Sequence, residues 1–496
     1  MNTEKLANRG KWTALTAALL GWMFDGLEMG LFPLVARPAL KDLLQTENDS
    51  LVGLWFTVIT AMFLVGAATG GVLFGWLGDR IGRVKAMTLS VFIYAVFSGL
   101  CGLATSATQI AILRFIASLG MGGEWSLGVA LVMEIWPDRS RAWLAGVIGA
   151  AANVGYMLIA LLGMVLTTVT KDLQGLLAST GMGDGTIQWL FKNDGWRVLM
   201  LLGATPAILT FLIRLFVPES KSWEKENAKG TTSMWKGSEL LGLLGGSLLA
   251  CGFVALWAAN DISLIVRIVG SVLLLPLIAY GFAYPILGFL KRMPETTGSL
   301  SNREIKRRLT LAALLSGVAL LGTWGSIQMI PTWADSLPNR TAYSKAYVQI
   351  ASAFGAVVGC IVAALCGGWF GRRKTYAVLC FLSIGAVLYV FRMHDKNGAA
   401  LVLASFVAGL ITASFYGWLP LYLPELFPTR MRAIGQGFGF NFGRIIAAVG
   451  VLQLGNMMRT YNLSYPTACS FLSLIYIVGF VVIWLAPETK GKPLPE

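Results

Sequence analysis

Four charged side chains interrupt apolar stretches of the sequence, where a charge is costly. Asp25 and Glu28 are three residues apart in one stretch, and Arg114 and Glu124 lie in another. Residues three apart on an α-helix share a face, so both acids of the first stretch point the same way. A carboxyl group beside a second acid and an arginine is suited to taking up and releasing a proton, because these neighbours shift its pKa in opposite directions.

We expect these four residues to form a proton-coupling group. A charge in the middle of a membrane costs about 2.5–3.5 kcal/mol on insertion scales, so such a residue must face a cavity or a partner. Asp25 is the candidate for the main proton carrier, Glu124 for a second carrier, and Arg114 for the charge that modulates them. Glu28 belongs to the same group or is a structural partner. The alternative is that Asp25 and Arg114 form a static buried pair.

A further buried charge, Arg444, lies in a later apolar stretch with no acid within one helical turn of it in the sequence. An arginine in this position indicates an anion site in a water-filled cavity, and the alternative is pairing with Asp25 or Glu28. Isolated amide and aromatic side chains complete a candidate pocket, since rings stack on solutes and amides bind hydroxyl groups; the alternative for each of them is a role in helix packing. These residues are Asn153, Tyr156, Trp324, Gln328, Tyr416 and Asn441.

The elements that position these residues are membrane-spanning helices. Of the 496 residues, 56% are hydrophobic and 13% are charged, whereas soluble domains carry about 25% charged residues. Apolar runs of about 20 residues, each long enough to cross the hydrocarbon layer, follow one another along the chain. The six cysteines lie in apolar runs without metal-ligand spacing, and there is a single histidine, His394. We therefore expect no metal, no cofactor other than a proton and no enzyme activity.

The net charge of +14 has two explanations, binding to nucleic acid or retention of positive loops in the cytoplasm. The second is preferred, because most Lys and Arg residues fall in loops on one predicted side. Lys5, Arg9 and Lys11 precede the first apolar run, which is too long for a cleavable signal. We expect a multi-pass protein of the cell inner membrane with both termini in the cytoplasm, a lipid bilayer as its surroundings and a monomeric state.

Three landmarks occur twice in the same order, which indicates two homologous halves in parallel repeat. They are the loop GWLGDRIGR (75–83) with its counterpart GGWFGRR (367–373), the pattern Glu134-x-x-Pro137-x-x-x-Arg141 with Glu425-x-x-Pro428-x-x-x-Arg432, and the closing segments beginning Pro218-Glu219 and Pro487-Glu488. Two extra apolar runs lie between the halves. The predicted fold is an all-α integral membrane protein with 14 spans: a six-helix bundle (1–217), a cytoplasmic linker with two additional helices (218–308), and a second six-helix bundle with its tail (309–496).

These motifs resemble the major facilitator superfamily over nearly the whole chain. The loop at 75–83 is the most specific element, and Asp25-Gly26-Leu27-Glu28 together with Gly-Met-Gly-Gly-Glu124-Trp125 is similar to the sialate:proton symporters and related metabolite:proton symporters. The resemblance implies alternating access by two rocking halves, proton symport, and a cytoplasmic gate at the loop. The gate residues are Gly78, Asp79, Arg80 and Arg83, supported by Glu134 with Arg141 and by Glu425 with Arg432. In the second copy Gly368 replaces the acid, so that latch is weaker or made differently.

The expected activity is secondary active transport of a small-molecule substrate. Arg444 and the resemblance favour proton-coupled symport of a small organic anion, such as a sialic acid-like or other organic acid. A neutral sugar or polyol is the alternative within the same fold, supported by the aromatic residues and by the closing PETKG segment. A membrane sensor on a transporter fold is the alternative from another class of protein.

Overall fold

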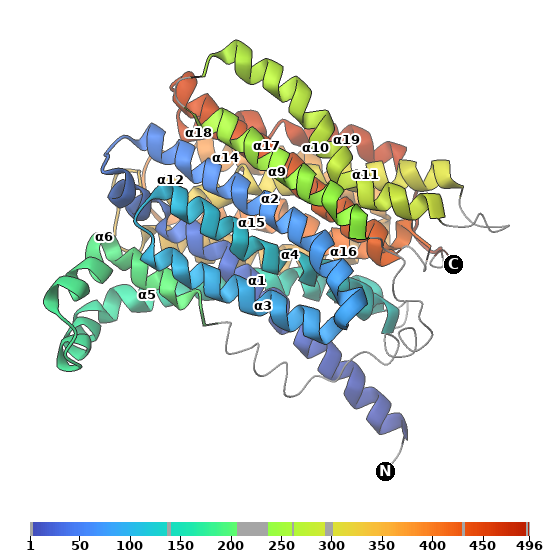
Figure 1. Ribbon diagram of the computed structural model, residues 1–496, viewed down its shortest axis with the longest axis horizontal. Helices are drawn as coiled ribbons and strands as arrows, with labels where there is room; N and C mark the ends of the chain where they lie inside the picture. The colour runs from blue at the N-terminus through green and yellow to red at the C-terminus, as the bar shows by residue number, and fades with distance from the viewer. Residues whose placement is uncertain are drawn as a thin grey trace.

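A computed structural model describes the backbone of residues 3–135, 140–205, 237–259, 262–292, 301–428, 432–492 and 495. Within these ranges, some side chains are not described, among them those of residues 79, 80, 83 and 124–135. Every regular element in the described ranges is helical. The helices run side by side in an elongated bundle, and both chain termini lie at the same end of it (Figure 1). We call this the termini end and the opposite one the far end.

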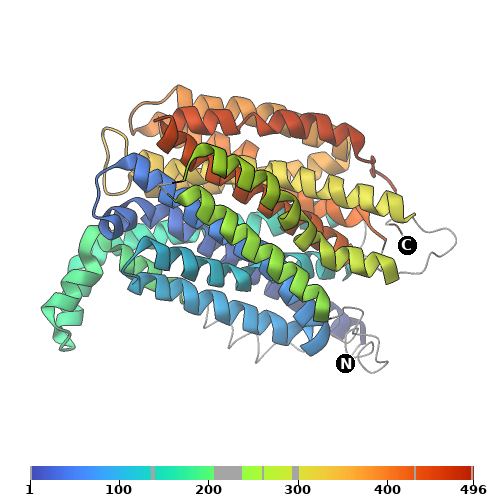
Figure 2. The same ribbon diagram turned by 45° about the horizontal axis from the view of Figure 1, so that its top comes forward.

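The first group of helices comes from the N-terminal part of the chain. Its members are α1 (Thr3–Leu44), α2 (Asp49–Ile81), α3 (Arg83–Leu100), the 3-10 turn η1 (Cys101–Leu103), α4 (Ala107–Ile135), α5 (Arg141–Ser179) and α6 (Asp184–Leu202). The side-chain oxygen of Asn48 accepts from the backbone N–H groups of Ser50 and Leu51 and so caps the start of α2. Helix α5 has 39 residues, longer than a bilayer requires, and with α6 it forms an arm that projects beyond the far end (Figure 2).

A hairpin of two helices, α9 (Gly237–Ala258) and α10 (Leu264–Arg292), precedes the second group. It lies along α2 and α17, where Thr69 of α2 donates to Ser247 of α9 at 2.8 Å. Most of the remaining surface of α10 consists of exposed apolar side chains. That surface is suited to contact with lipid chains.

The second group of helices occupies residues 302–485. Its members are α11 (Asn302–Trp324), η3 (Ile327–Met329), α12 (Ile330–Ala334), α13 (Ser344–Phe370), α14 (Arg372–Arg392), α15 (Ala399–Thr412), α16 (Phe415–Tyr422), η4 (Leu423–Leu426), α17 (Arg432–Thr460), α18 (Tyr465–Leu472), α19 (Ile475–Val482) and η6 (Ile483–Leu485). Helix α11 stops at Trp324, and the chain continues through Gly325, η3 and α12 in nearly the same direction. This break is tolerated because it faces the interior of the protein.

Twelve helical runs within the described ranges are long and apolar enough to cross a membrane. The sequence predicts fourteen spans, and the described part of the structure shows twelve of them. The two remaining expected spans, 108–134 and 196–217, fall on α4, whose side chains are described only as far as Gly123, and on a segment described only as far as Thr205.

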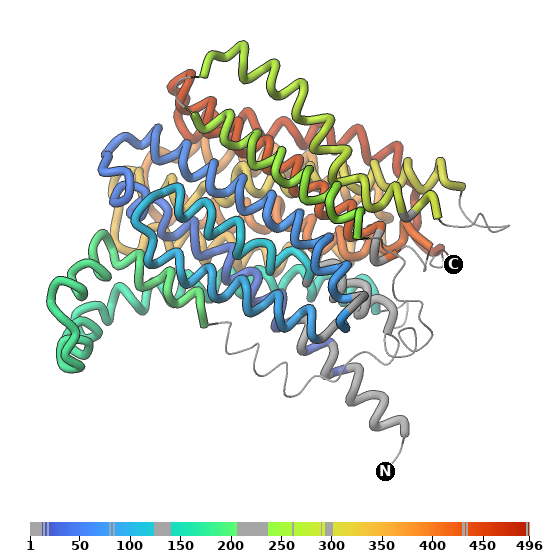
Figure 3. The backbone as a smooth tube through the Cα atoms, viewed as in Figure 1, coloured from blue at the N-terminus to red at the C-terminus, as the bar shows by residue number. Residues whose placement is uncertain are grey.

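The two groups meet along two pairs of helices, α5 with α13 and α2 with α17, and Figure 3 shows the backbone of α2 running along the length of the bundle. Within the first group, α1 and α5 approach so closely that glycine is required at the contact. A Cβ added to Gly26 would lie 1.6 Å from the carbonyl oxygen of Ala152, and one added to Gly155 would lie 1.6 Å from that of Met23. This contact brings Asp25 of α1 and Asn153 of α5 to one interior surface.

Candidate functional site

A cavity of about 80 Å³ lies in the interior, between the two groups of helices. Its wall contains seven of the residues selected from the sequence: Asp25, Asn153, Tyr156, Trp324, Gln328, Tyr416 and Arg444. They come from α1, α5, α11, η3, α16 and α17, so both groups contribute. The remaining described wall is largely apolar. Ligand pockets usually have volumes of about 300–1,000 Å³, so this cavity must widen to hold a solute.

Arg444 is the strongest hydrogen-bond donor in the wall. It is 6% exposed, and its Nη1 donates to the carbonyl oxygen of Ala67 at 3.1 Å and to Oδ1 of Asn441 at 2.9 Å. The guanidinium carbon lies 4.9 Å from the centre of the Phe440 ring. Its other two nitrogens, Nε and Nη2, donate to no acceptor within the described ranges. Asn441 thus lies beside the cavity and holds Arg444, whereas the free edge of the guanidinium is available to an anion.

Asp25 brings a carboxylate to the same cavity. It is buried in α1, and its charge is close enough to act on the guanidinium of Arg444. Met29, one helical turn further along α1, also lines the wall. The cavity therefore combines an acid from the first group of helices with an arginine from the second.

Glu28 and Arg114 are brought together outside this cavity. They form an ion pair between Glu28 Oε1 and Arg114 Nη1, and their side chains are 1% and 2% exposed. The guanidinium of Arg114 lies 4.5 Å from the ring centre of Phe63 and 5.3 Å from that of Phe32. Because Phe63 lines the cavity, its ring separates this ion pair from the space that a solute would occupy.

Helix α2 ends and α5 begins at the termini end of the bundle (Figure 1). Gly78 is buried in α2 and Arg141 is half-buried at the start of α5. The side chains of Glu124, Asp79, Arg80, Arg83 and Glu134 lie outside the described residues.

In the second group, an ion-paired cluster occupies the termini end. Arg372 donates to Glu425 through Nε at 3.0 Å and Nη2 at 2.6 Å, and Thr489 donates to the same carboxylate at 2.6 Å. Arg432 donates to the carbonyl oxygens of Pro424 and Pro495. The repeated pattern pointed to Glu425 and Arg432 but did not select Arg372, which is the second copy's equivalent of the basic loop residues.

Glu488, in the C-terminal segment, supplies the acid that the second loop lacks. Its carboxylate accepts from the backbone N–H groups of Arg372 and Arg373 at 3.1 Å each, at the start of α14. Burial alone would raise the pKa of Glu488, but these N–H groups and those of Thr489 and Lys490 hold that pKa below its usual range. In the second half the acid is thus provided by a segment distant in sequence.

Gln349 of α13 is a buried residue that the sequence did not single out. It is fully buried, and its Nε2 donates to the carbonyl oxygen of Gly30 at 3.1 Å and to that of Tyr156 at 3.0 Å. One amide of the second group thus bridges α1 and α5 of the first. Like Gln328, it is an isolated amide in an apolar run, and that signal could have identified it.

Contacts between the two groups lie on both sides of the cavity. Toward the far end the Tyr156 hydroxyl donates to Oε1 of Gln328 at 3.0 Å. The two hydrogen bonds of Gln349 join the same two groups there. Toward the termini end an apolar cluster joins α1 and α5 to α13 and α16, and it contains Leu15, Trp22, Leu144, Ile148, Ala364 and Leu421. The cavity is therefore bounded by contacts between the groups in both directions.

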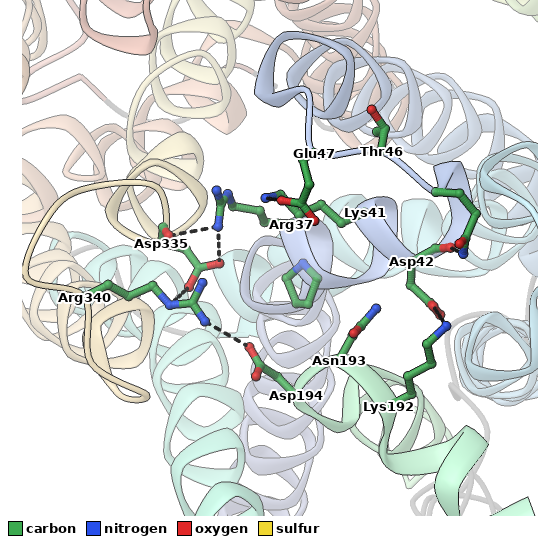
Figure 4. Close-up of a pocket in the computed structure, with 12 residues that line it drawn as sticks. Arg37, Lys41, Asp42, Thr46, Glu47, Lys192, Asn193, Asp194, Asp335 and Arg340 are labelled. Carbon is green, nitrogen blue, oxygen red and sulfur yellow. Dashed lines mark hydrogen bonds and ion pairs between the residues drawn. The ribbon is translucent and has the colours of Figure 1, made fainter. Parts of the chain in front are cut away.

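A second and larger hollow, of about 560 Å³, opens at the far end. Charged side chains from both groups line it (Figure 4). Arg37 of α1 lies 3.6 Å from Asp335, at the end of α12, and donates to Asp49 at 3.1 Å. Arg340 lies 3.4 Å from Asp335 and 3.8 Å from Asp194 of α6. We call these five residues the far-end ionic chain. Arg37 lies in the last turns of α1 and the other four lie at helix ends, in loops or at the kink of α6, where the sequence gives no reason to select particular charges.

The described helices form a polytopic bundle with an interior cavity between two groups, an arrangement typical of membrane transporters. The chain matches the Major Facilitator Superfamily over residues 14–451, and it belongs to that family. It is 27% identical to a putative metabolite transport protein of Haemophilus influenzae, with 99% of this chain and 100% of that protein covered. It is 22% identical to the sialic acid transporter NanX of Escherichia coli, with 96% and 95% covered.

Among solved structures, the fold is similar to the proton:xylose symporter XylE of E. coli bound to 6-bromo-6-deoxy-D-glucose. The TM-score is 0.64 at 17% identity, and 98% of each chain is covered. At this identity the likeness extends to the fold alone. The matching proteins are transporters and not enzymes, so this chain is a membrane transporter of metabolites.

Proposed function

We propose that this transporter carries a small organic anion, a carboxylate, by symport with protons. The observation that supports the anion is Arg444, a buried arginine in the wall of the central cavity whose Nε and Nη2 have no acceptor among the described residues. A buried guanidinium edge without an acceptor is unfavourable unless water or an anion occupies it. A relative that transports an acid, the sialic acid transporter, supports the same class of solute.

Asp25 is the proposed main site of the coupling proton, with Glu124 as the second candidate. Asp25 shares the cavity wall with Arg444, so an anion bound to the arginine changes the electrostatic environment of the carboxyl group. A bound anion favours the protonated form of a nearby acid, because two negative charges repel each other. Arg114, paired with Glu28 behind Phe63, is proposed to contribute its charge from a distance rather than by contact.

The transport cycle is proposed to alternate between the two groups of helices. The bundles 1–217 and 309–496 are the rocking bodies, and the linker 218–308 adds two spans. The twelve described runs include those two, and α4 and residues 196–217 bring the proposed number to fourteen. The termini end faces the cytoplasm on this topology, with a gate formed by Gly78, Asp79, Arg80 and Arg83 and supported by the Glu134, Arg141, Glu425 and Arg432 side chains. One chain contains the whole site, so a monomer is sufficient.

Uptake into proteoliposomes with an imposed proton gradient tests this proposal. Organic acids should accumulate and should compete with one another, whereas neutral sugars should not compete. The Asp25→Asn variant should lose gradient-driven accumulation and keep solute exchange, because it binds solute but cannot carry the proton. Arg444→Lys should weaken acid uptake strongly, because it lacks the planar fork; Arg392→Lys, which lies in another part of the second group, is the matched control.

A neutral sugar or polyol is the second candidate, favoured by the aromatic wall residues Trp324 and Tyr416. Competition by neutral sugars alone would select it and reject the anion. Accumulation that survives in Asp25→Asn would assign the proton to another group.

A further inference from the structure

A strip of the α2 backbone lies against the arginine of the cavity wall. Ala67 and Gly71 are one helical turn apart on α2 and therefore share a face. The carbonyl oxygen of Ala67 accepts from Nη1 of Arg444 at 3.1 Å. The side-chain amide of Asn441 lies against Gly71. Because α2 belongs to the first group of helices and α17 to the second, both contacts join the two groups.

Two acceptors hold one edge of the guanidinium. Nη1 of Arg444 donates to the carbonyl oxygen of Ala67 and, at 2.9 Å, to Oδ1 of Asn441. A carbonyl oxygen has two lone pairs, so Ala67 can accept from Arg444 as well as within its own helix. Because a guanidinium only donates, the oxygen of the Asn441 amide must face it. The two acceptors thereby fix the direction of the other edge, Nε and Nη2, to which a carboxylate can bind through two parallel hydrogen bonds.

Gly71 leaves the space that the Asn441 amide occupies. A Cβ added to Gly71 would lie 2.1 Å from Nδ2 and 2.4 Å from Oδ1 of Asn441, whereas ordinary contacts begin near 3.4 Å. Any other residue at this position therefore pushes the amide away from its place beside Arg444. Glycine inside a helix is less favourable than alanine, so a buried glycine within α2 needs such a reason.

Gly122 of α4 meets the same strip. A Cβ added to Gly122 would lie 2.0 Å from the carbonyl oxygen of Ala67 and 2.5 Å from the backbone nitrogen of Gly71. The glycine-rich motif of α4 thus lets this helix approach α2 at the turn that receives Arg444, and the adjacent Met121 lines the cavity. A side chain at position 122 would displace the carbonyl group that the guanidinium uses.

We propose that Gly71 is a positioning residue of the anion site. It seats Asn441, which together with the Ala67 carbonyl group aims Arg444 at the solute. This inference depends on the proposed anion site and adds to it the backbone of a helix from the other group. It also makes the site depend on the contact between α2 and α17, so an anion held by a correctly aimed Arg444 favours the conformations in which these two helices touch.

Equilibrium binding to the purified full-length protein in detergent tests the proposal. The probes are sialic acid, benzoate and propionate, with glucose as the neutral comparison. Gly71→Ala should bind the acid preferred by wild type at least about tenfold more weakly, because a turned guanidinium loses a charge-assisted hydrogen bond. Asn441→Ala should weaken binding by a similar factor. The double variant Gly71→Ala/Asn441→Ala should bind no more weakly than Asn441→Ala, since the added methyl group then meets no amide.

Two further variants separate positioning from packing. Asn441→Asp keeps the shape of the side chain and its acceptor oxygen, but it adds a negative charge beside the guanidinium. It should therefore bind the acid at least about tenfold more weakly than wild type, whereas a packing role for the amide would leave the affinity unchanged. Gly385→Ala is the matched control, because a Cβ at this exposed glycine of α14 meets nothing within 4 Å; it should bind as wild type does.

The outcomes distinguish this inference from the proposal beneath it. Wild-type binding of none of the three acids would overturn the anion site and this inference with it. Acid binding that Arg444→Lys weakens, but that Gly71→Ala and Asn441→Asp leave unchanged, would overturn the inference alone. So would a double variant in which the two losses add, since Gly71 would then act through other contacts.

Thermal unfolding of each variant identifies a loss of fold. If Gly71→Ala alone does not fold, recovery of the fold in the double variant shows the clash with Asn441, and the affinity of Asn441→Asp then decides whether the amide aims Arg444. A double variant that also fails to fold would overturn the seating of Asn441 on Gly71.

Discussion

Glu28 and Arg114 form an ion pair that is sealed within the first group of helices, behind the ring of Phe63. The contact joins Oε1 of Glu28 to Nη1 of Arg114, and two aromatic rings lie against the guanidinium. Removing one partner of such a pair leaves an uncompensated charge away from water, which is much less favourable than removing both.

The pair therefore predicts a non-additive effect on stability. Glu28→Leu and Arg114→Met should each lower the free energy of unfolding by about 3–5 kcal/mol, and the double variant Glu28→Leu/Arg114→Met should recover most of that loss. Thermal unfolding in detergent measures all three. Additive losses in the double variant would mean that the two side chains are held by other groups.

Gln349 predicts a shift of the conformational equilibrium. Gln349→Met removes both hydrogen bonds from α13 to the backbones of α1 and α5, so the far end should open more often. In a cysteine-free background, a cysteine placed at the buried Thr332 should react several-fold faster with a membrane-impermeant maleimide added from the far side. An equal rate in wild type and variant would show that the bridge does not restrain opening; Gln453→Met is a control on α17.

The far-end ionic chain predicts rescue by exchange of charges between the groups. Asp335 is 4% exposed and faces both Arg37 and Arg340. Asp335→Arg should disfavour closure of the far end, because three arginines would then meet, and Arg37→Asp combined with it should restore part of the effect. The maleimide rate at position 332 reports closure. Failure of the exchange to restore the rate would show that the contact is not electrostatic.

The Glu488 cap predicts a pH-dependent contribution to stability. Because its folded pKa is lowered, its contribution is fully present above the unfolded value of about 4.3 and is lost as the pH falls through the folded pKa. Glu488→Gln should therefore be less stable than wild type by about 1 kcal/mol above pH ~5, with the difference shrinking below that. A difference that stays constant down to pH ~3 would contradict a role for the carboxylate charge.

The membrane class and the repeat could be read from the sequence alone. A long apolar run in lipid forms a membrane-spanning helix, because a helix satisfies the hydrogen bonds of its own backbone N–H and C=O groups. Arg444 could also be selected as a candidate site residue from the sequence, because a charged side chain within an apolar run must face a partner or a cavity. Two occurrences of the loop and of the Glu425 to Arg432 pattern sufficed to identify the family of the fold.

Only the tertiary structure decided which charges meet. Asp25 and Glu28 share one helix and are three residues apart, yet Asp25 lines the cavity and Glu28 pairs with Arg114 behind Phe63. That distinction depends on the packing of α1 against α5 at Gly26 and Gly155, which fixes the rotation of α1. Glu488 and Gln349 act on backbone groups far away in the chain, and such partners have no signature in local spacing.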